Sequence, residues 1–183
     1  MLRYPAALLA LTLLPLAACD TGDPSDPDTT IRRVVITEVS VDDAPLLRED
    51  GDDWDGGVFG LGVNPDIFFE LVNDDTGSFL IDPPVDNFTD VDANDFPLVW
   101  SASPGTDERA MDEVAFAQNR FDVSLAFDLY DEDPELTQGE DDYMGSTEAF
   151  NLQDLVDGSR PSFLDLESAD GEISVRVRLR YES

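Results

Sequence analysis

Apolar and polar residues alternate along several short segments of this chain, and the alternation predicts strands. In residues 172–181, apolar side chains at every second position face one way and polar side chains face the other. Residues 122–129 show the same period of two, which gives a strand one buried face and one exposed face. The β-branched run 31–41 and the apolar run 67–72 are also typical of strands.

Weaker strand patterns occur at residues 78–81 and 96–100, where Pro83, Pro84 and several Asp residues interrupt the chain. A turn of helix is indicated only near residues 151–156, and the sequence has no internal repeat of fixed period. Short strands, each with one apolar face and separated by turn-rich loops, predict an all-β fold, namely an antiparallel β-sandwich.

The first residues have the features of an export signal. A short positive start, Met1-Leu2-Arg3, precedes an Ala- and Leu-rich stretch, 6–16, that is too short to span a bilayer. The sequence Leu16-Ala17-Ala18-Cys19 resembles the lipobox of bacterial lipoproteins, which implies cleavage before Cys19 and a lipid on its thiol. We therefore expect residues 1–18 to be a lipoprotein signal peptide and Cys19 to anchor the protein in a membrane of the bacterial cell envelope, on its periplasmic or cell-surface side.

A tether is predicted between this anchor and the folded part. Residues 20–30 are polar and Pro-rich and have no apolar side chains to bury, so residues 19–30 form the lipidated Cys and a flexible acidic tether. Fully extended, the tether reaches at most about 36 Å. Residues 31–183 are then one β-sandwich domain, a length that suits a single domain, and we expect a monomer.

The charge of the chain excludes several classes of function. The sequence has 42 acidic residues, ten Arg, no Lys and no His, and its formal net charge is −32. Without His or Lys there is no imidazole base, no His-ligated zinc and no Schiff-base lysine. Because affinity for phosphate backbones depends on Lys and Arg, we expect no nucleic-acid partner.

The excess of acid also predicts a dependence on salt. Removal of residues 1–18, which include Arg3 and no acid, would leave a charge of −33. Repulsion on this scale weakens a compact state at low salt, and ionic strength near 1 M shortens the Debye length to about 3 Å. The acid-rich, Lys-free composition therefore resembles that of halophilic proteins, and a second interpretation, in which the acids hold cations, is compatible with the first.

Two loops concentrate carboxylates beside predicted strands. The first runs from Glu49 to Gly56 and is followed by Asp66 at the start of a strand, and the second runs from Asp131 to Gly145. So many like charges raise the free energy unless a cation or water offsets them, and oxygen ligands at flexible spacing suit Ca²⁺ better than Mg²⁺. An EF-hand is excluded, because Leu136 occupies the position that requires Gly and a strand pattern precedes the loop.

Four motifs, in order along the chain, resemble those of C2 domains, which are calcium- and phospholipid-binding β-sandwiches. They are the strand start Asp66-Ile67-Phe68-Phe69-Glu70-Leu71, the segment Leu125 to Asp133 with its Leu-x-Phe-x-Leu-x-Asp-x-Asp pattern, the Asp-x-x-Gly motif Asp142-Tyr143-Met144-Gly145, and the closing strand Gly171 to Val177. The resemblance covers residues 31–182. It implies a Greek-key β-sandwich of about eight strands.

The resemblance also implies a calcium site at one end of the sandwich. Its ligands would be Asp66, Asp131, Asp133 and Asp142. The family's first-loop acid falls on Gly60 here, so Asp53 or Asp55 from a longer loop would take its place. Calcium is thus the expected cofactor, and a calcium-dependent lipid, glycan or protein partner is expected at the cell envelope.

Several features have a second interpretation. Trp54 is expected to anchor its loop on the edge of the sandwich, with a membrane-inserting tip as the alternative. The stripe of Arg176, Arg178 and Arg180 is expected to balance acids on neighbouring strands, with recognition of phosphate or carboxylate groups as the alternative. Paired carboxylates can cleave glycosidic bonds, but no single acid in an apolar pocket is indicated, so we expect no enzyme. The alternative function is a structural or adhesive lipoprotein without a metal site.

Overall fold

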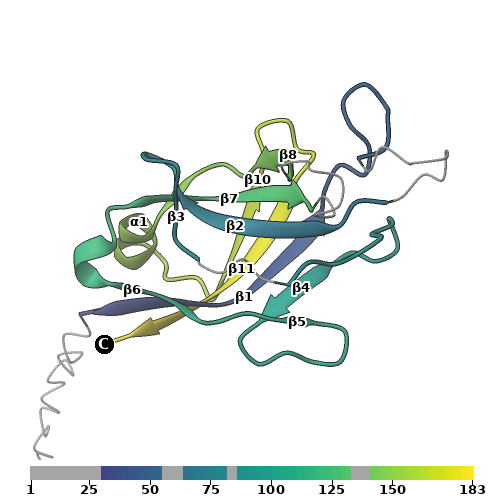
Figure 1. Ribbon diagram of the computed structural model, residues 1–183. Coiled ribbons are helices and arrows are strands. Elements are labelled where there is room, and N and C mark those ends of the chain that lie inside the picture. Colours follow the sequence, from purple (N-terminus) through teal and green to yellow (C-terminus); the bar gives the residue numbers. More distant parts are fainter. Residues whose placement is uncertain (1–29, 55–63, 82–85, 133–140) are drawn as a thin grey trace, which may run out of the picture.

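Two β-sheets lie face to face in the computed structural model, which describes residues 30–54, 64–81, 86–132 and 141–183 (Figure 1). The described strands are β1 (Arg33–Asp43), β2 (Ile67–Asn73), β3 (Ser78–Phe79), β4 (Leu98–Ser101), β5 (Arg109–Ala110), β6 (Val114–Ala117), β7 (Ser124–Asp131), β8 (Asp142–Ser146), β9 (Phe150–Asn151), β10 (Phe163–Glu167) and β11 (Ser174–Glu182). A 3-10 turn, η1 (Gln118–Arg120), and one helix, α1 (Leu152–Asp157), complete the described elements.

The first sheet has the strand order β10-β11-β1-β4-β5, and β6 also pairs with β1. The second sheet has the order β3-β2-β7-β8, and β9 also pairs with β7. Every described pairing is antiparallel except that of β4 with β5. The prediction of an all-β antiparallel sandwich is therefore confirmed, with β4 and β5 as the one parallel pair among the described strands. About eight strands were expected, and the described residues form eleven, of which β3, β5 and β9 have only two residues each.

The alternation in the sequence corresponds to the two faces of each strand. In β11, Val175, Val177 and Leu179 are buried between the sheets, while Arg176 and Arg178 are exposed. The other clear alternation behaves in the same way in β7, where the apolar positions at every second residue lie in the core. The predicted turn of helix is α1, which Asn151 caps by accepting a 2.8 Å hydrogen bond from the Gln153 backbone N–H.

Aromatic side chains fill the centre of the core. Trp100 is completely buried, and its ring makes edge-to-face contacts with Phe69 at 5.0 Å and with Phe88 at 4.8 Å between centroids. Its indole N–H donates a 2.7 Å hydrogen bond to the Asp86 carbonyl. Since a buried indole needs a partner for its N–H, this bond ties residues 86–88 to the core.

The strands place two different sets of residues at the two ends of the sandwich (Figure 1). At the entry end, β1 begins and the Gln118 N–H donates to the Arg32 carbonyl at 2.9 Å. At the opposite end β1 finishes, β2 begins and β7 finishes. We call this second end the loop end, and it comprises residues 44–54, 64–66, 86–90, 131–132 and 141–142. Among the described residues, no helix has the length and apolar character needed to cross a membrane.

Candidate functional site

Asp66 and Asp131 meet at the loop end because the antiparallel register pairs Ile67 with Asp131. The backbone N–H of Asp66 donates a 2.6 Å hydrogen bond to Oδ1 of Asp131. The Asp131 residue is completely buried, so its carboxylate lies beneath the start of β2 and not on the open surface. Two of the predicted ligands, 65 residues apart in sequence, are thus brought into contact.

A third segment, which the sequence analysis did not single out, completes this cluster. The backbone N–H of Asp90 donates a 2.7 Å hydrogen bond to Oδ1 of Asp66. The Asp66 carbonyl accepts from the Glu132 N–H at 2.9 Å, and the Asn87 amide donates to the Glu132 carboxylate. Asp90 has a φ of 54°, a conformation that Asp tolerates better than most residues. The signal available in the sequence is the Asp-rich stretch 86–95, which lies between two weak strand patterns.

The surroundings of Asp66 change the pKa of its carboxyl group. Partial burial raises the pKa of Asp66, the hydrogen bond from the Asp90 N–H lowers it, and the negative charge of Asp90 raises it again. The net effect is upward, so the ionised form of Asp66 is less stable here than in water. A cation beside Asp66 and Asp90 would offset both the loss of water and the repulsion.

Asp142 also reaches the loop end, because β8 begins there and Asp142 pairs with Asp131 across the sheet. Its carboxylate forms an ion pair with the Arg48 guanidinium. Arg48 in turn donates a 2.7 Å hydrogen bond to the Trp54 carbonyl and lies 5.5 Å from the centroid of the Trp54 ring. The guanidinium therefore neutralises Asp142 and links it to the loop 44–54.

Trp54 fixes that loop to the sandwich. The residue is only 9% exposed and belongs to the core cluster, and its indole N–H donates a 2.8 Å hydrogen bond to the Pro45 carbonyl. The prediction that Trp54 anchors its loop is confirmed. Asp53 bridges to Leu47 through the backbone, and its side chain is exposed. Asp55, Asp133 and Cys19 lie outside the described residues.

The predicted ligands fit calcium in their chemistry but not in their arrangement. The described residues supply oxygen ligands only, which is the chemistry calcium prefers, and Asp66, Asp131 and Asp142 lie at one end of the sandwich. Within residues 30–54, 64–81, 86–132 and 141–183, however, no three acidic side chains are arranged so that they could hold a metal ion together. A complete site would need Asp55 or Asp133, or the release of Asp142 from Arg48.

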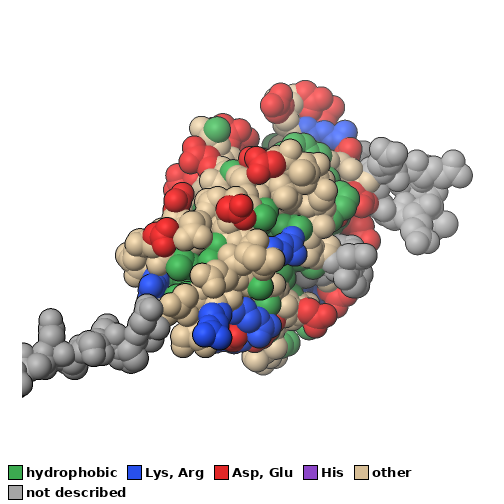
Figure 2. All heavy atoms as spheres, turned by 90° about the vertical axis from the view of Figure 1, so that its left-hand side faces the viewer, with side chains coloured by type: hydrophobic (Ala, Val, Ile, Leu, Met, Phe, Trp, Pro, Cys, Tyr) green, Lys and Arg blue, Asp and Glu red, His purple; other side chains and the backbone are tan. Residues whose placement is uncertain are grey.

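The arginine stripe balances acids, as predicted. We define the arginine face as the outer surface of the first sheet, where ion pairs join Arg33 to Glu182, Arg176 to Asp42 and Asp165, Arg178 to Glu38, and Arg180 to Glu113 and Glu182. Figure 2 views the molecule from the entry end. Acidic side chains are spread over this face, and the largest group of basic side chains lies low in the view, on the side of the first sheet.

No protein-family model matches the chain, and neither does any curated protein. Solved structures do match it. A structure described as that of a C2 domain shares 11% identity with a TM-score of 0.46, over 83% of this chain and 99% of that one. A C2 domain protein from Ramazzottius varieornatus shares 14% identity with a TM-score of 0.38, over 84% and 91% of the two chains.

Extended-synaptotagmin 2, solved with its SMP domain and two C2 domains, shares 16% identity with a TM-score of 0.43. That match covers 83% of this chain but only 27% of the other, so the chain corresponds to a small part of that protein. These three structures are described as C2 domains or as containing them. The likeness concerns the fold alone.

Proposed function

We propose that this chain is a C2-like binding module, anchored through a lipid on Cys19 at the bacterial cell envelope, whose loop end takes up Ca²⁺ and docks a partner there. The observation that carries the proposal is the contact between Asp66 and Asp131. A buried carboxylate at the end of β7 accepts a hydrogen bond from the backbone N–H of Asp66, the residue before β2, whose own carboxyl group has a raised pKa.

Electrostatics favour a cation at this place. Asp66 and Asp90 are adjacent, and the charge of Asp90 makes the ionised form of Asp66 less favourable. Calcium takes six to eight oxygen ligands at flexible geometry, including backbone carbonyls and water as well as carboxylates. The loop end offers such oxygens from Asp66, Asp131 and Asp142, and from Asp53, Asp55 and Asp133 if their loops contribute.

The position of the anchor supports a docking role directed outwards. The tether joins the sandwich at Ile31, beside the start of β1, and the loop end lies at the other end of that strand (Figure 1). The eleven residues of β1 separate the two ends by roughly 33 Å. With the lipid on Cys19 in one membrane, the tether would leave the loop end unattached, so that it could reach a partner elsewhere in the envelope.

Calorimetric titration of CaCl₂ into the chain at constant ionic strength tests the proposal. We expect binding with a dissociation constant of about 10⁻⁴–10⁻³ M, as in other extracellular calcium modules. Asp66→Asn should abolish the binding heat, whereas Asp154→Asn, an exposed change on α1 near the entry end, should leave it unchanged. Arg48→Gln should tighten binding, because it removes the cation that competes for Asp142.

The alternative is a structural or adhesive lipoprotein without a metal site, and one observation favours it. Asp142 is already neutralised by Arg48, and the described acids of the arginine face are neutralised in the same way. A titration without binding heat, in which Arg48→Gln also shows none, would decide for this alternative.

A further inference from the structure

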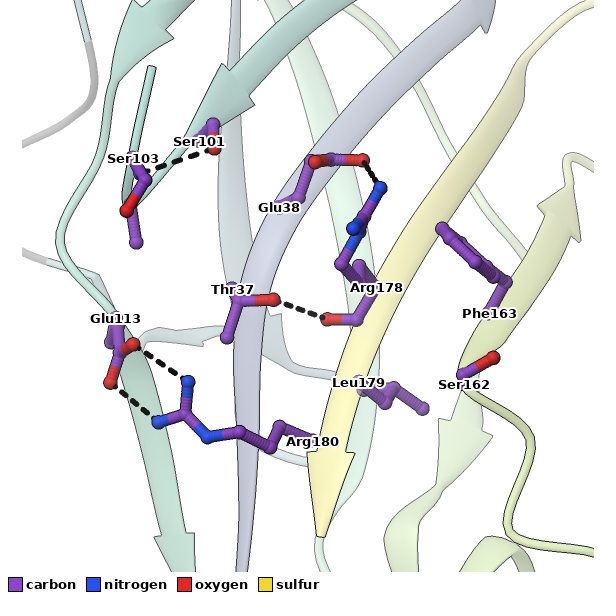
Figure 3. Close-up of a pocket in the computed structure, with 11 residues that line it drawn as sticks. Thr37, Glu38, Ser101, Ser103, Glu113, Ser162, Phe163, Arg178, Leu179 and Arg180 are labelled. Atoms are coloured by element: carbon purple, nitrogen blue, oxygen red, sulfur yellow. Dashed lines mark hydrogen bonds and ion pairs between the residues drawn. The ribbon is translucent and has the colours of Figure 1, made fainter.

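A shallow groove crosses the outer face of the first sheet, on the side away from the core (Figure 3). Its volume is about 460 Å³, which falls within the roughly 300–1,000 Å³ of small-ligand sites. Among the residues that line it are Thr37, Glu38, Ser101, Phe163, Arg178 and Arg180. None of them lies at the loop end, so the groove is separate from the candidate calcium site.

The strand register arranges the groove as a row of different chemical groups. Phe163 pairs with Arg178, Arg178 pairs with Glu38, and Glu38 pairs with Ser101. Because neighbouring strands lie about 4.8 Å apart, this row across β10, β11, β1 and β4 is roughly 14 Å long. An aromatic ring, a guanidinium, a carboxylate and a hydroxyl therefore follow one another along the groove.

An irregularity in β1 forms part of the groove. The register between β1 and β11 shifts between Ile36 and Glu38, so Thr37 is the extra residue of a β-bulge. On the other edge of β1, the chain leaves β4 after Ser101, and the Ala102 N–H donates to the Thr37 carbonyl at 3.0 Å. The side chains of Ser101 and Ser103 lie together at one end of the groove (Figure 3). The Thr37 hydroxyl lies nearer its middle, where it donates a 3.5 Å hydrogen bond to the Arg178 carbonyl.

The charges in the groove cancel. Arg178 forms a 3.2 Å ion pair with Glu38, and both terminal nitrogens of Arg180 bind the two Glu113 oxygens at 2.9 Å. Two positive and two negative side chains thus line a neutral surface in a chain whose net charge is −32. A polyanion would meet the two carboxylates and a polycation the two guanidiniums, so neither complements the groove.

A neutral ligand with many hydroxyl groups does complement it. Guanidinium donors, carboxylate acceptors and hydroxyls that both donate and accept are all present, and sugar hydroxyls can bond to each of them. Phe163 is 43% exposed, and the Arg178 guanidinium lies 4.8 Å from its ring centroid, which holds the ring in place. An exposed, fixed aromatic ring offers an apolar surface to the C–H face of a sugar.

We infer that this groove binds a neutral oligosaccharide. Phe163 stacks on one sugar ring, while Arg178, Glu38 and Ser101 hydrogen-bond the hydroxyls of the neighbouring unit. The binding needs none of the acids at the loop end. Its failure and the failure of the calcium proposal are therefore distinguishable, because the groove is tested in the presence of a chelator.

The test is a set of calorimetric titrations of the full chain, in chelator, with neutral tetrasaccharides: cellotetraose, xylotetraose, maltotetraose and chitotetraose. Dextran sulfate and vesicles of phosphatidylcholine serve as the anionic and lipid comparisons. We expect at least one neutral tetrasaccharide to bind, and binding to persist in high salt. Phe163→Ala should weaken it about tenfold, near the upper end of the contribution of one aromatic contact.

Three further variants make the outcome specific. Phe79→Ala removes another exposed Phe, 59% exposed on the second sheet, and should leave binding unchanged. Phe163→Leu keeps an apolar side chain and should fold normally, yet bind as weakly as Phe163→Ala. Arg178→Lys keeps the charge but loses the planar fork, so it should also bind more weakly.

Two results would overturn the inference. The first is the absence of binding by all four neutral tetrasaccharides, or binding that Phe163→Leu and Arg178→Lys leave unchanged. The second is binding of dextran sulfate or of the vesicles that these two variants abolish, since this would assign the groove to an anionic polymer or to a lipid surface.

Discussion

Glu70 on β2 and Asp128 on β7 lie directly opposite each other on the outer face of the second sheet. Tyr130 lies beside them and stacks on Phe68, with ring centroids 5.3 Å apart. Burial and the charges of Asp128 and Glu70 raise the pKa of Tyr130 to about 12. Burial, followed by the charge of Asp128, raises the pKa of Glu70. Two like charges therefore face each other across a ladder, an arrangement that destabilises a sheet.

Glu70→Gln should stabilise the fold at neutral pH by about 0.5 kcal/mol, since it removes this repulsion. Because the pKa of Glu70 is raised in the folded state, ionised Glu70 disfavours folding. The cost is present above the folded pKa and disappears as the pH falls through it. Melts at pH 7 should show a higher midpoint for the variant, and melts in acid should show a smaller difference.

Glu113→Gln is the matched control, and its expected effect on the melting midpoint at pH 7 is opposite to that of Glu70→Gln. Hydrogen bonding to Arg180 lowers the pKa of Glu113, so ionised Glu113 favours the folded state. Its stabilisation is present above the pKa of the unfolded chain and is lost as the pH falls through the lower folded value. Glu113→Gln should therefore lower the midpoint at pH 7. A fall in midpoint for Glu70→Gln at pH 7 would contradict this account of the second sheet.

Trp100→Ala should destabilise the domain by about 4 kcal/mol, because it removes a completely buried indole that contacts Phe69 and Phe88. Urea unfolding followed by circular dichroism measures the loss. Phe79→Ala, at an exposed position, should change stability by less than about 0.5 kcal/mol. Similar losses for the two variants would show that Trp100 does not hold the core together.

Thermal stability in the presence of a chelator should rise as NaCl increases towards 1 M. A net charge of −32 is mainly repulsive, and salt at this concentration shortens the Debye length to about 3 Å. The ion pairs of the arginine face will weaken in salt, but each exposed pair contributes little. A midpoint that stays constant or falls with NaCl would remove the halophilic interpretation.

Cys19→Ser should release the protein from membranes or block removal of residues 1–18, because the thiol that would carry the lipid is lost. Membrane fractionation and the mass of the mature protein measure both effects. Cys19 is not the anchor if the variant fractionates with membranes as before and its mature mass differs from that of the unchanged protein only by the exchange of Cys for Ser.

The sequence predicted the central strands because their residues alternate between a buried and an exposed face. β7 and β11 carry a buried apolar side chain at every second position, and the prediction follows from that pattern alone. β8 and β10 gave no such signal. Each buries a single residue, Met144 in β8 and Leu166 in β10, since these strands lie at the edges of the two sheets.

The sequence predicted those site residues that lie at the ends of strands. Asp66, Asp131 and Asp142 lie at the boundaries of β2, β7 and β8, so their convergence follows once the strands are placed. The contacts of Asp66 with Asp90 and of Asp142 with Arg48 could not be predicted. Both depend on how loops fold back over the end of the sandwich, which no periodicity in the sequence encodes.

The most direct test of the calcium proposal is a comparison of thermal melts of residues 31–183 in millimolar CaCl₂ and in NaCl of matched ionic strength. Bound calcium should stabilise the fold by about 2.7 kcal/mol at a hundredfold excess over the dissociation constant. The calcium-specific rise should disappear in Asp131→Asn and Asp133→Asn and persist in Asp154→Asn. Identical melting curves in the two salts would contradict the proposal and leave these acids as a charged surface only.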